Sequence, residues 1–254
     1  ILGLPGETLQ SFCDGIDKSI DGGAHDGLLV YLCRVLPGSE MDADAYRTLH
    51  GIETVRLPIQ AHHGSLDAAT VCPTEYEETV VATKTMPHAD WLEAQRIAWF
   101  VEVFFVLGIA RLPLLWLREH GVKVTEFARW ALRCDVLDRA RIEAYLASQD
   151  RGAPDVPRDG LDAFGAIRWP IEEASWLALM SARDSTYAKL LALVEAFCDA
   201  RGLDKYAVRV RENMKRLKHW TDGVSPADPA EFAKTVLWYG RRGGSMLCLP
   251  LEES

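Results

Sequence analysis

The sequence predicts an α+β protein that is mostly α-helical, and two observations lead to this fold class. The first forty residues alternate between strand-like apolar runs and one amphipathic helix. Beyond Pro87, apolar residues recur almost everywhere at intervals of three and four, which is the spacing of a buried helix face. We therefore expect an α/β part over residues 1–86 and a helical part over residues 87–254.

The α/β part is expected to contain one long helix and one long strand. The helix begins after Thr8 and ends at Asp21-Gly22-Gly23, where glycine tolerates a left-handed cap. Its apolar residues share one face and are Leu9, Phe12, Ile16 and Ile20. Residues 27–35 form a nearly continuous apolar run, which predicts a strand buried on both faces, as in a parallel sheet.

Shorter elements are expected between this strand and the helical part. Residues 42–50 favour a short helix that ends at Gly51. Residues 53–59 and 78–85 are rich in β-branched residues and favour strands. The polar residues 60–73 favour a loop.

The helical part contains the most apolar window of the chain, residues 97–117. This window is as long as a membrane span, but Glu102 and Arg111 would each cost roughly 2.5–3.5 kcal/mol inside a bilayer. We therefore expect no membrane span but two buried helices that separate at Gly108. Asp90 is expected to cap the first helix.

Further helices are expected toward the C-terminus. They begin near Pro113, Thr125, Asp135, Pro170, Ser185, Leu203 and Asp228. Residues 149–160 carry two prolines and two glycines and form the best candidate for a linker. The tryptophans lie within helical patterns, which favours packing in the core over contact with a ligand.

Charge and cysteine content exclude several classes of protein. A net charge of -9 argues against broad binding to nucleic acid or to an anionic membrane, because both need a basic face. The six cysteines are scattered, without a CxxC or CxxxCxxC motif, which fits reduced thiols in the cytoplasm better than disulfides. His62, His63, Cys72 and His88 lack ligand spacing, so we predict no metal site within this chain.

Two glycine-proline turns follow the strand-like segments. Gly3-Leu4-Pro5-Gly6-Glu7-Thr8 follows Ile1-Leu2 and opens the first helix, and Leu36-Pro37-Gly38-Ser39-Glu40-Met41 ends the second strand. Glycine lets backbone amides come close to a bound ligand, and proline fixes the turn. Glu7 and Thr8 favour the helix N-terminus that follows.

This layout resembles that of radical S-adenosylmethionine enzymes. In that superfamily the first turn resembles the end of the fifth barrel strand, the second resembles the end of the sixth, and both strands help to form the adenosyl site. The similarity is greatest to members with an upstream cobalamin-binding domain, and its motifs lie in residues 1 to about 55. It implies that residues 1–86 hold the last strands of a partial (β/α) barrel with an extension, followed by a helical C-terminal domain.

The resemblance also implies cofactors, substrate and site residues. The intact enzyme would use S-adenosylmethionine, a [4Fe-4S] cluster and cobalamin, and would transfer a methyl group to a small-molecule substrate. The expected cofactor-binding residues are Gly3, Leu4, Pro5, Gly6, Leu36 and Pro37. Weaker candidates for substrate contact are Tyr31 and Cys33 on the second strand, and His62 and His63 in the loop. For these four residues, ordinary packing or a plain polar loop stays open.

No catalytic residue is assigned, because the family's cluster cysteines and cobalamin domain should precede Ile1. Ile1-Leu2-Gly3 resembles the end of a strand already under way, so we expect a missing N-terminal part of the same enzyme. Without that part the chain is expected to be inactive. A different class also stays open, namely a helical interaction module without catalytic activity.

Overall fold

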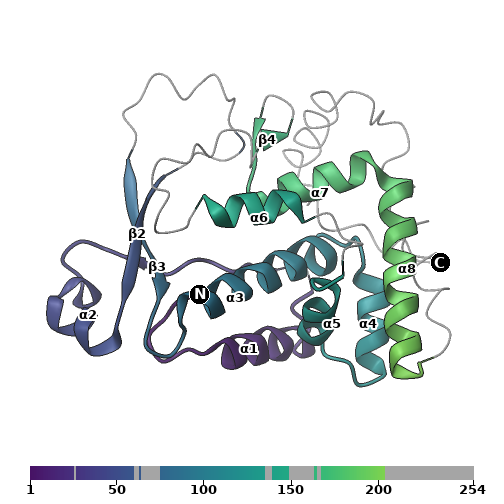
Figure 1. Ribbon diagram of the computed structural model, residues 1–254, viewed down its shortest axis with the longest axis horizontal. Coiled ribbons are helices and arrows are strands. Elements are labelled where there is room, and N and C mark those ends of the chain that lie inside the picture. Colours follow the sequence, from purple (N-terminus) through teal and green to yellow (C-terminus); the bar gives the residue numbers. More distant parts are fainter. Residues whose placement is uncertain are drawn as a thin grey trace.

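The computed structural model describes residues 1–25, 27–59, 63, 75–134, 139–148, 163–164 and 167–203 (Figure 1). These residues are mostly helical and include a three-stranded antiparallel sheet, which confirms the α+β, mostly helical class. The helices are α1 (Leu9–Asp21), α2 (Asp44–His50), α3 (His88–Phe100), α4 (Arg111–Glu119), α5 (Val124–Ala131), α6 (Ala140–Ala147), α7 (Ile171–Ser181) and α8 (Arg183–Arg201). Two further helical segments are the 3-10 turn η1 (Glu40–Asp42) and the π-helix η3 (Val101–Val106). The strands are β1 (Arg34–Val35), β2 (Glu53–Pro58), β3 (Tyr76–Ala82), β4 (Ala163–Phe164) and β5 (Ile167–Arg168).

Helix α1 forms where the apolar spacing predicts it. Thr8 caps the helix: its hydroxyl accepts a hydrogen bond from the Ser11 N–H, and the Ser11 hydroxyl accepts one from the Thr8 N–H. Its buried face includes Phe12, Ile16 and Ile20. Gly23, two residues past the last helical residue, has a φ of 91°.

The sheet differs from the prediction at residues 27–35. Strand order is β1-β3-β2 with both pairs antiparallel, and only Arg34–Val35 of the predicted strand joins it. Leu32 forms a single parallel bridge with Leu2, while Leu29 and Tyr31 are exposed. The prediction of a long strand buried on both faces is therefore wrong here. An apolar run forms a ladder only where a partner strand lies beside it, and Leu2 supplies just one such residue.

The shorter elements lie close to their predicted places. Helix α2 ends at Gly51, whose φ of 58° is left-handed, and β2 covers the predicted residues 53–59 to within one residue. Strand β3 lies about two residues earlier than expected. Of the predicted loop 60–73, only His63 is among the described residues.

The apolar window folds as two helical segments that separate at Gly108, as predicted. Helix α3 continues into η3, and α4 then runs at 102° to them. Among the described residues, no single helix is long and apolar enough to cross a bilayer. The two segments of this bent pair reach that length and apolar content only when taken together. The prediction that Asp90 caps α3 is wrong, because α3 begins at His88 after Pro87 and Asp90 lies in its first turn.

The core surrounds α3 and η3. In Figure 1, α3 runs through the middle of the molecule with α1 along one side and α6 along the other. Helix α5 also contacts α3, and α7 contacts η3. The main cluster of buried residues extends from Leu2 to Cys198, so it includes residues on both sides of the predicted boundary at Pro87. Four of the tryptophans within helical patterns are buried, namely Trp91, Trp99, Trp116 and Trp176.

The later helices begin close to the predicted residues. Pro113 lies in the first turn of α4, and α5 begins one residue before Thr125. Pro170 is the N-cap of α7, and α8 begins two residues before Ser185. The predicted start at Asp135, the linker 149–160 and the two helices after Leu203 lie outside the described residues.

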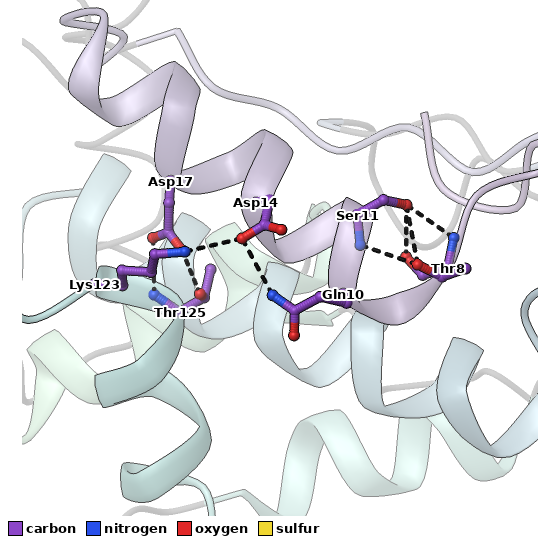
Figure 2. A network of polar contacts seen from close by, with 7 residues as sticks. All are labelled: Thr8, Gln10, Ser11, Asp14, Asp17, Lys123 and Thr125. Carbon is purple, nitrogen blue, oxygen red and sulfur yellow. Dashed lines mark hydrogen bonds and ion pairs between the residues drawn. The ribbon is translucent and has the colours of Figure 1, made fainter.

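A polar contact joins α1 to α5 within this core (Figure 2). Asp17 is buried on α1, and its carboxylate accepts hydrogen bonds from the Thr125 hydroxyl (2.5 Å) and the Thr125 N–H (3.2 Å). A buried carboxylate needs such donors, because burial removes it from water. The start of α5 thus holds a group that α1 could not bury alone.

We predict that Thr125→Val lowers the free energy of unfolding by about 1–3 kcal/mol, because it removes the hydroxyl that Asp17 accepts from. Urea unfolding at neutral pH measures the change. Thr48→Val, at an exposed position on α2, is the control and should change stability by less than about 0.5 kcal/mol. Equal effects of the two substitutions would contradict a structural role for this contact.

Candidate functional site

The first glycine-proline turn is held in place by close packing. Leu2 is fully buried, and Gly3 follows it with a φ of 99°. A Cβ on Gly3 would lie 3.4 Å from the Val80 carbonyl oxygen and 3.5 Å from the Cys33 Cβ. The Gly3 N–H donates to the Glu7 carboxylate (3.3 Å), which closes the turn ahead of α1. Burial raises the pKa of Glu7, and this hydrogen bond opposes the rise.

The second turn is fixed by charge. The Ser39 N–H donates to the Leu36 carbonyl (3.0 Å), and the Gly38 N–H donates to the Asp42 carboxylate (2.9 Å). Arg47 donates to the same carboxylate (2.9 Å) and to Glu78 on β3 (2.5 Å). The Gly38 N–H and the Arg47 guanidinium lower the pKa of Asp42. The second turn is thereby attached to both α2 and β3.

The two turns follow neighbouring segments that run in the same direction. The Leu2 N–H donates to the Tyr31 carbonyl and the Cys33 N–H donates to the Leu2 carbonyl, both at 2.8 Å. Because the carboxyl ends of parallel neighbours meet at one edge, the chain leaves both segments on the same side. The six predicted cofactor residues therefore come from adjacent segments; Gly3 is buried among them, Pro5 is half-buried, and Leu4, Gly6, Leu36 and Pro37 are exposed.

Of the four predicted substrate residues, Tyr31 is exposed, Cys33 is buried, and His63 contacts the helical part of the chain. Tyr31 is 64% exposed, whereas Cys33 is buried with Val35 and Val80. Burial raises the pKa of the Cys33 thiol, so it stays protonated at neutral pH. His62 lies outside the described residues.

His63 is described, and its ring contacts the helical part. Its Nε2 lies 2.7 Å from a Glu173 oxygen, and its ring packs edge-on against Trp169. In the portion of the chain that the structure describes, no three His, Cys, Asp or Glu side chains are grouped so that they could hold a metal ion.

Sequence reasoning missed a pair of carboxyl groups near this histidine, of which Glu102 is buried and Glu172 is half-buried. Glu102 on η3 is 9% exposed, and it accepts a hydrogen bond from the Val30 N–H (2.7 Å). Glu102 and Glu172 both line a cavity of about 100 Å³, together with Leu2, Val30 and Leu32. The signal was present, because Glu102 is an acidic residue within the most apolar window of the chain.

Burial makes both carboxyl groups weaker acids. It raises the pKa of Glu102 well above its ordinary value, and the negative charge of Glu172 adds to the rise. Burial also raises the pKa of Glu172 to about 7, and the nearby Glu173 adds to that rise. At neutral pH, Glu102 and Glu172 can therefore hold a proton in the cavity that Val30 and Leu32 also line.

Two curated proteins are similar to this chain. One is the cobalamin-dependent radical SAM methyltransferase TokK of Streptomyces tokunonensis, which is 27% identical over 215 residues, or 75% of this chain and 30% of the relative. The other is the 2-(S-pantetheinyl)-carbapenam-3-carboxylate methyltransferase of Streptantibioticus cattleyicolor, which is 26% identical over 219 residues, or 77% and 31%. Both relatives are methyltransferases.

The chain spans about a third of the length of these two methyltransferases. No family model matches it. The predicted likeness to cobalamin-dependent radical S-adenosylmethionine enzymes is confirmed at this coarse level. The similarity extends over far more of the chain than the turn motifs, because the matched region is 215 residues long in the first comparison.

We predict opposite effects from two glycine substitutions. Gly3→Ala should lower the free energy of unfolding by about 1–2 kcal/mol, because an L-residue is strained at a φ of 99° even though its Cβ would make only ordinary contacts with Val80. Gly15 lies inside α1 with open space around its Cα, so Gly15→Ala is the matched control. It should raise the free energy of unfolding by about 0.5–1 kcal/mol. Chemical unfolding measures both, and a stable Gly3→Ala protein would contradict this account of the turn.

We also predict that protein stability decreases as pH rises from 4.5 through about 7. The folded protein holds its proton on Glu172 more tightly than the unfolded chain does, so folding is favoured at low pH and the advantage is lost as this group ionises. Glu172→Gln should be more stable than the parent by about 1–2 kcal/mol at pH 8 and equal to it near pH 4.5. Thermal unfolding across this pH range measures the difference.

The control for this prediction is Glu119→Gln on α4, where the side chain is exposed. Its pH profile should run parallel to that of the parent protein. If the pH profile of the Glu172→Gln protein were also parallel to that of the parent, the Glu172 carboxyl group would not contribute to the pH dependence of stability.

Proposed function

We propose that this chain is the C-terminal part of a cobalamin-dependent radical S-adenosylmethionine methyltransferase that acts on a small-molecule substrate in the cytoplasm. The proposal rests on two glycine-proline turns that leave adjacent parallel segments, in a chain similar to two methyltransferases. In this proposal the parallel segments are the last strands of a (β/α) barrel, and residues 87–254 form the helical domain beside it.

Exposed apolar side chains support a partner on the outer side of these segments. Ile1, Leu29, Tyr31 and Leu36 are each at least half exposed, while Leu2, Val30 and Leu32 pack toward the core. Exposed apolar residues gathered at one place mark a surface that another part of a protein covers. We propose that the N-terminal part of the same enzyme, with the first barrel strands, covers it.

The two turns fit one wall of a site for the adenosyl group. Apart from the adjoining residues, no atom of the described part of the chain lies within 4 Å of the position that a Cβ would occupy on Gly6 or Gly38, so a ligand can approach the backbone there. Leu4, Leu36 and Pro37 would supply exposed apolar surface beside it. In this role, Asp42 holds the second turn in position. Gly3, which its hydrogen bond to Glu7 fixes in the first turn, stays with Pro5 among the proposed cofactor-binding residues.

Among the described residues, no three His, Cys, Asp or Glu side chains are grouped so that they could hold an iron-sulfur cluster. Cluster ligands are thiolates, and burial raises the pKa of both Cys13 and Cys198 to about 11 and also raises that of Cys33. The proposal therefore assigns the [4Fe-4S] cluster and the cobalamin to the N-terminal part. When bound, S-adenosylmethionine at the cluster supplies the radical chemistry, and cobalamin supplies the methyl group.

The predicted substrate contacts differ in how well they fit this proposal. Tyr31 lies on the same open side as Leu29, so it can reach a substrate held near the turns. His63 instead faces Glu173 and Trp169. Tyr31 is thus the strongest of the four candidates.

The proposal predicts that Leu36→Asp lowers the formation of 5′-deoxyadenosine at least about 10-fold in the reconstituted full-length protein, because a charge replaces apolar contact beside the cofactor. Leu49→Asp on α2 is the matched control, since its side chain is 62% exposed against 66% for Leu36. It should leave the rate unchanged. Chromatography of the reaction products measures the rate.

The same assay tests the reaction itself. A methylated product that forms only with added cobalamin supports the proposal. Formation of 5′-deoxyadenosine without cobalamin dependence and without a methylated product would overturn the methyl-transfer part. A reading frame without a CxxxCxxC motif upstream would overturn the whole assignment.

A further inference from the structure

A groove of about 410 Å³ lies where α1, α5 and α8 meet. This volume is within the range of small-molecule sites, which is roughly 300–1,000 Å³. Gln10 and Cys13 line it from α1, while α5 and α8 supply most of its remaining wall. Neither the two turns nor the carboxyl pair described above lines this groove.

The groove is rich in cationic side chains although the chain carries a net charge of -9. Lys123, Arg129, Arg133 and Arg201 line it, with Glu126 as the single lining carboxylate. Arg129 lies on α5, and Arg133 lies two residues past the end of that helix. Arg133 is exposed, so its charge faces the solvent at the groove.

Three of the four cations hold partly exposed ion pairs. Lys123 Nζ donates to Asp14 (2.9 Å), Arg201 pairs with Glu126, and Arg129 Nε lies 3.3 Å from a Glu93 oxygen. Exposed pairs of this kind are worth about 0–1 kcal/mol, so an incoming anion can compete with them. These three cations can contribute to binding without first being unpaired at high cost.

The guanidinium groups of Arg129 and Arg133 have unused hydrogen-bonding capacity. Arg133 is exposed, and its side chain has no ion pair or hydrogen bond within the described residues. Arg129 Nε is buried, and although it lies 3.3 Å from Glu93, the geometry is not that of a hydrogen bond. A buried donor without an acceptor is costly, and an anion in the groove would relieve that cost.

The groove also offers aromatic surface and a fixed rim. Trp130 is half-buried and lines it, and the buried Phe197 packs edge-to-face against Trp130 with ring centroids 5.1 Å apart. On the rim, Gln10 and Lys123 both donate to Asp14, and Thr125 donates to Asp17 (Figure 2). These contacts hold the rim side chains before any ligand binds, which lowers the entropy cost of binding.

We propose that this groove binds a small organic anion, namely a phosphate monoester attached to a flat apolar group. The planar guanidinium groups of Arg129 and Arg133 would donate to the phosphate oxygens, a match that arginine makes through paired N–H groups. The apolar group would pack against Trp130, which Phe197 holds in position from the core side. The site would thus recognise charge at one end of a ligand and shape at the other.

Calorimetric titration of the full-length protein with 2-naphthyl phosphate tests the site. We expect saturable binding that weakens with added salt, and binding of 2-naphthol at least 10-fold weaker. Arg133→Gln should weaken binding of the phosphate at least 10-fold without changing stability, because that side chain is exposed and unpaired among the described residues. Arg118→Gln on α4, which loses an ion pair to Asp21 elsewhere, is the control and should bind as the parent does.

Equal binding of 2-naphthyl phosphate to the parent protein and to Arg133→Gln would overturn the proposal, as would equal binding of 2-naphthol. If the Arg129→Gln protein folds, it extends the test, and it should also bind 2-naphthyl phosphate more weakly than the parent protein does. Because none of these variants alters the turn residues, 5′-deoxyadenosine formation can be measured on each protein. Loss of phosphate binding with that reaction intact would separate this site from the proposed function.

Discussion

The structure is organised by the need to cover one helix whose buried side chains lie on most of its sides. From Trp91 to Leu107, α3 and η3 bury side chains around most of their circumference, so no single neighbour can shield them. Helices α1, α5 and α6 and strand β3 contact α3, and α4, α5 and α7 contact η3. This requirement brings elements from both ends of the described chain together. It also explains why the buried cluster does not stop at the predicted boundary.

Burial within this assembly also creates the polar features. Glu102 is carried into the interior on η3, where Leu107 N–H bonds to the Glu102 carbonyl five residues back. π-helical turns of this kind often occur at functional sites. Asp17 is buried in the same way on α1, and Thr125 satisfies it. In both cases a carboxyl group inside the core is held by a donor that is distant in sequence.

The sequence was sufficient where local chemistry decides the structure. The apolar spacing after Thr8, the break at Gly108 and the left-handed end at Gly51 all depend on nearby residues, and the structure agrees with each. The strand over residues 27–35 was predicted wrongly because its extent depends on which residues lie beside it. The proximity of Glu102 to Glu172, and of His63 to Glu173, joins residues 70 or more positions apart, which periodicity cannot indicate. The turn motifs identified neighbouring segments, whereas the carboxyl pair and the basic groove emerged only from the packing of helices.

The hydrogen bond from the Val30 N–H to the Glu102 carboxylate restricts the residue type differently at its two positions. Position 30 takes part through its backbone, so any residue except proline presents the same N–H. Position 102 takes part through its side chain and needs an acceptor of the same length. This contact therefore excludes only proline at position 30, where packing against the core sets the side chain, while it confines position 102 to glutamate or glutamine.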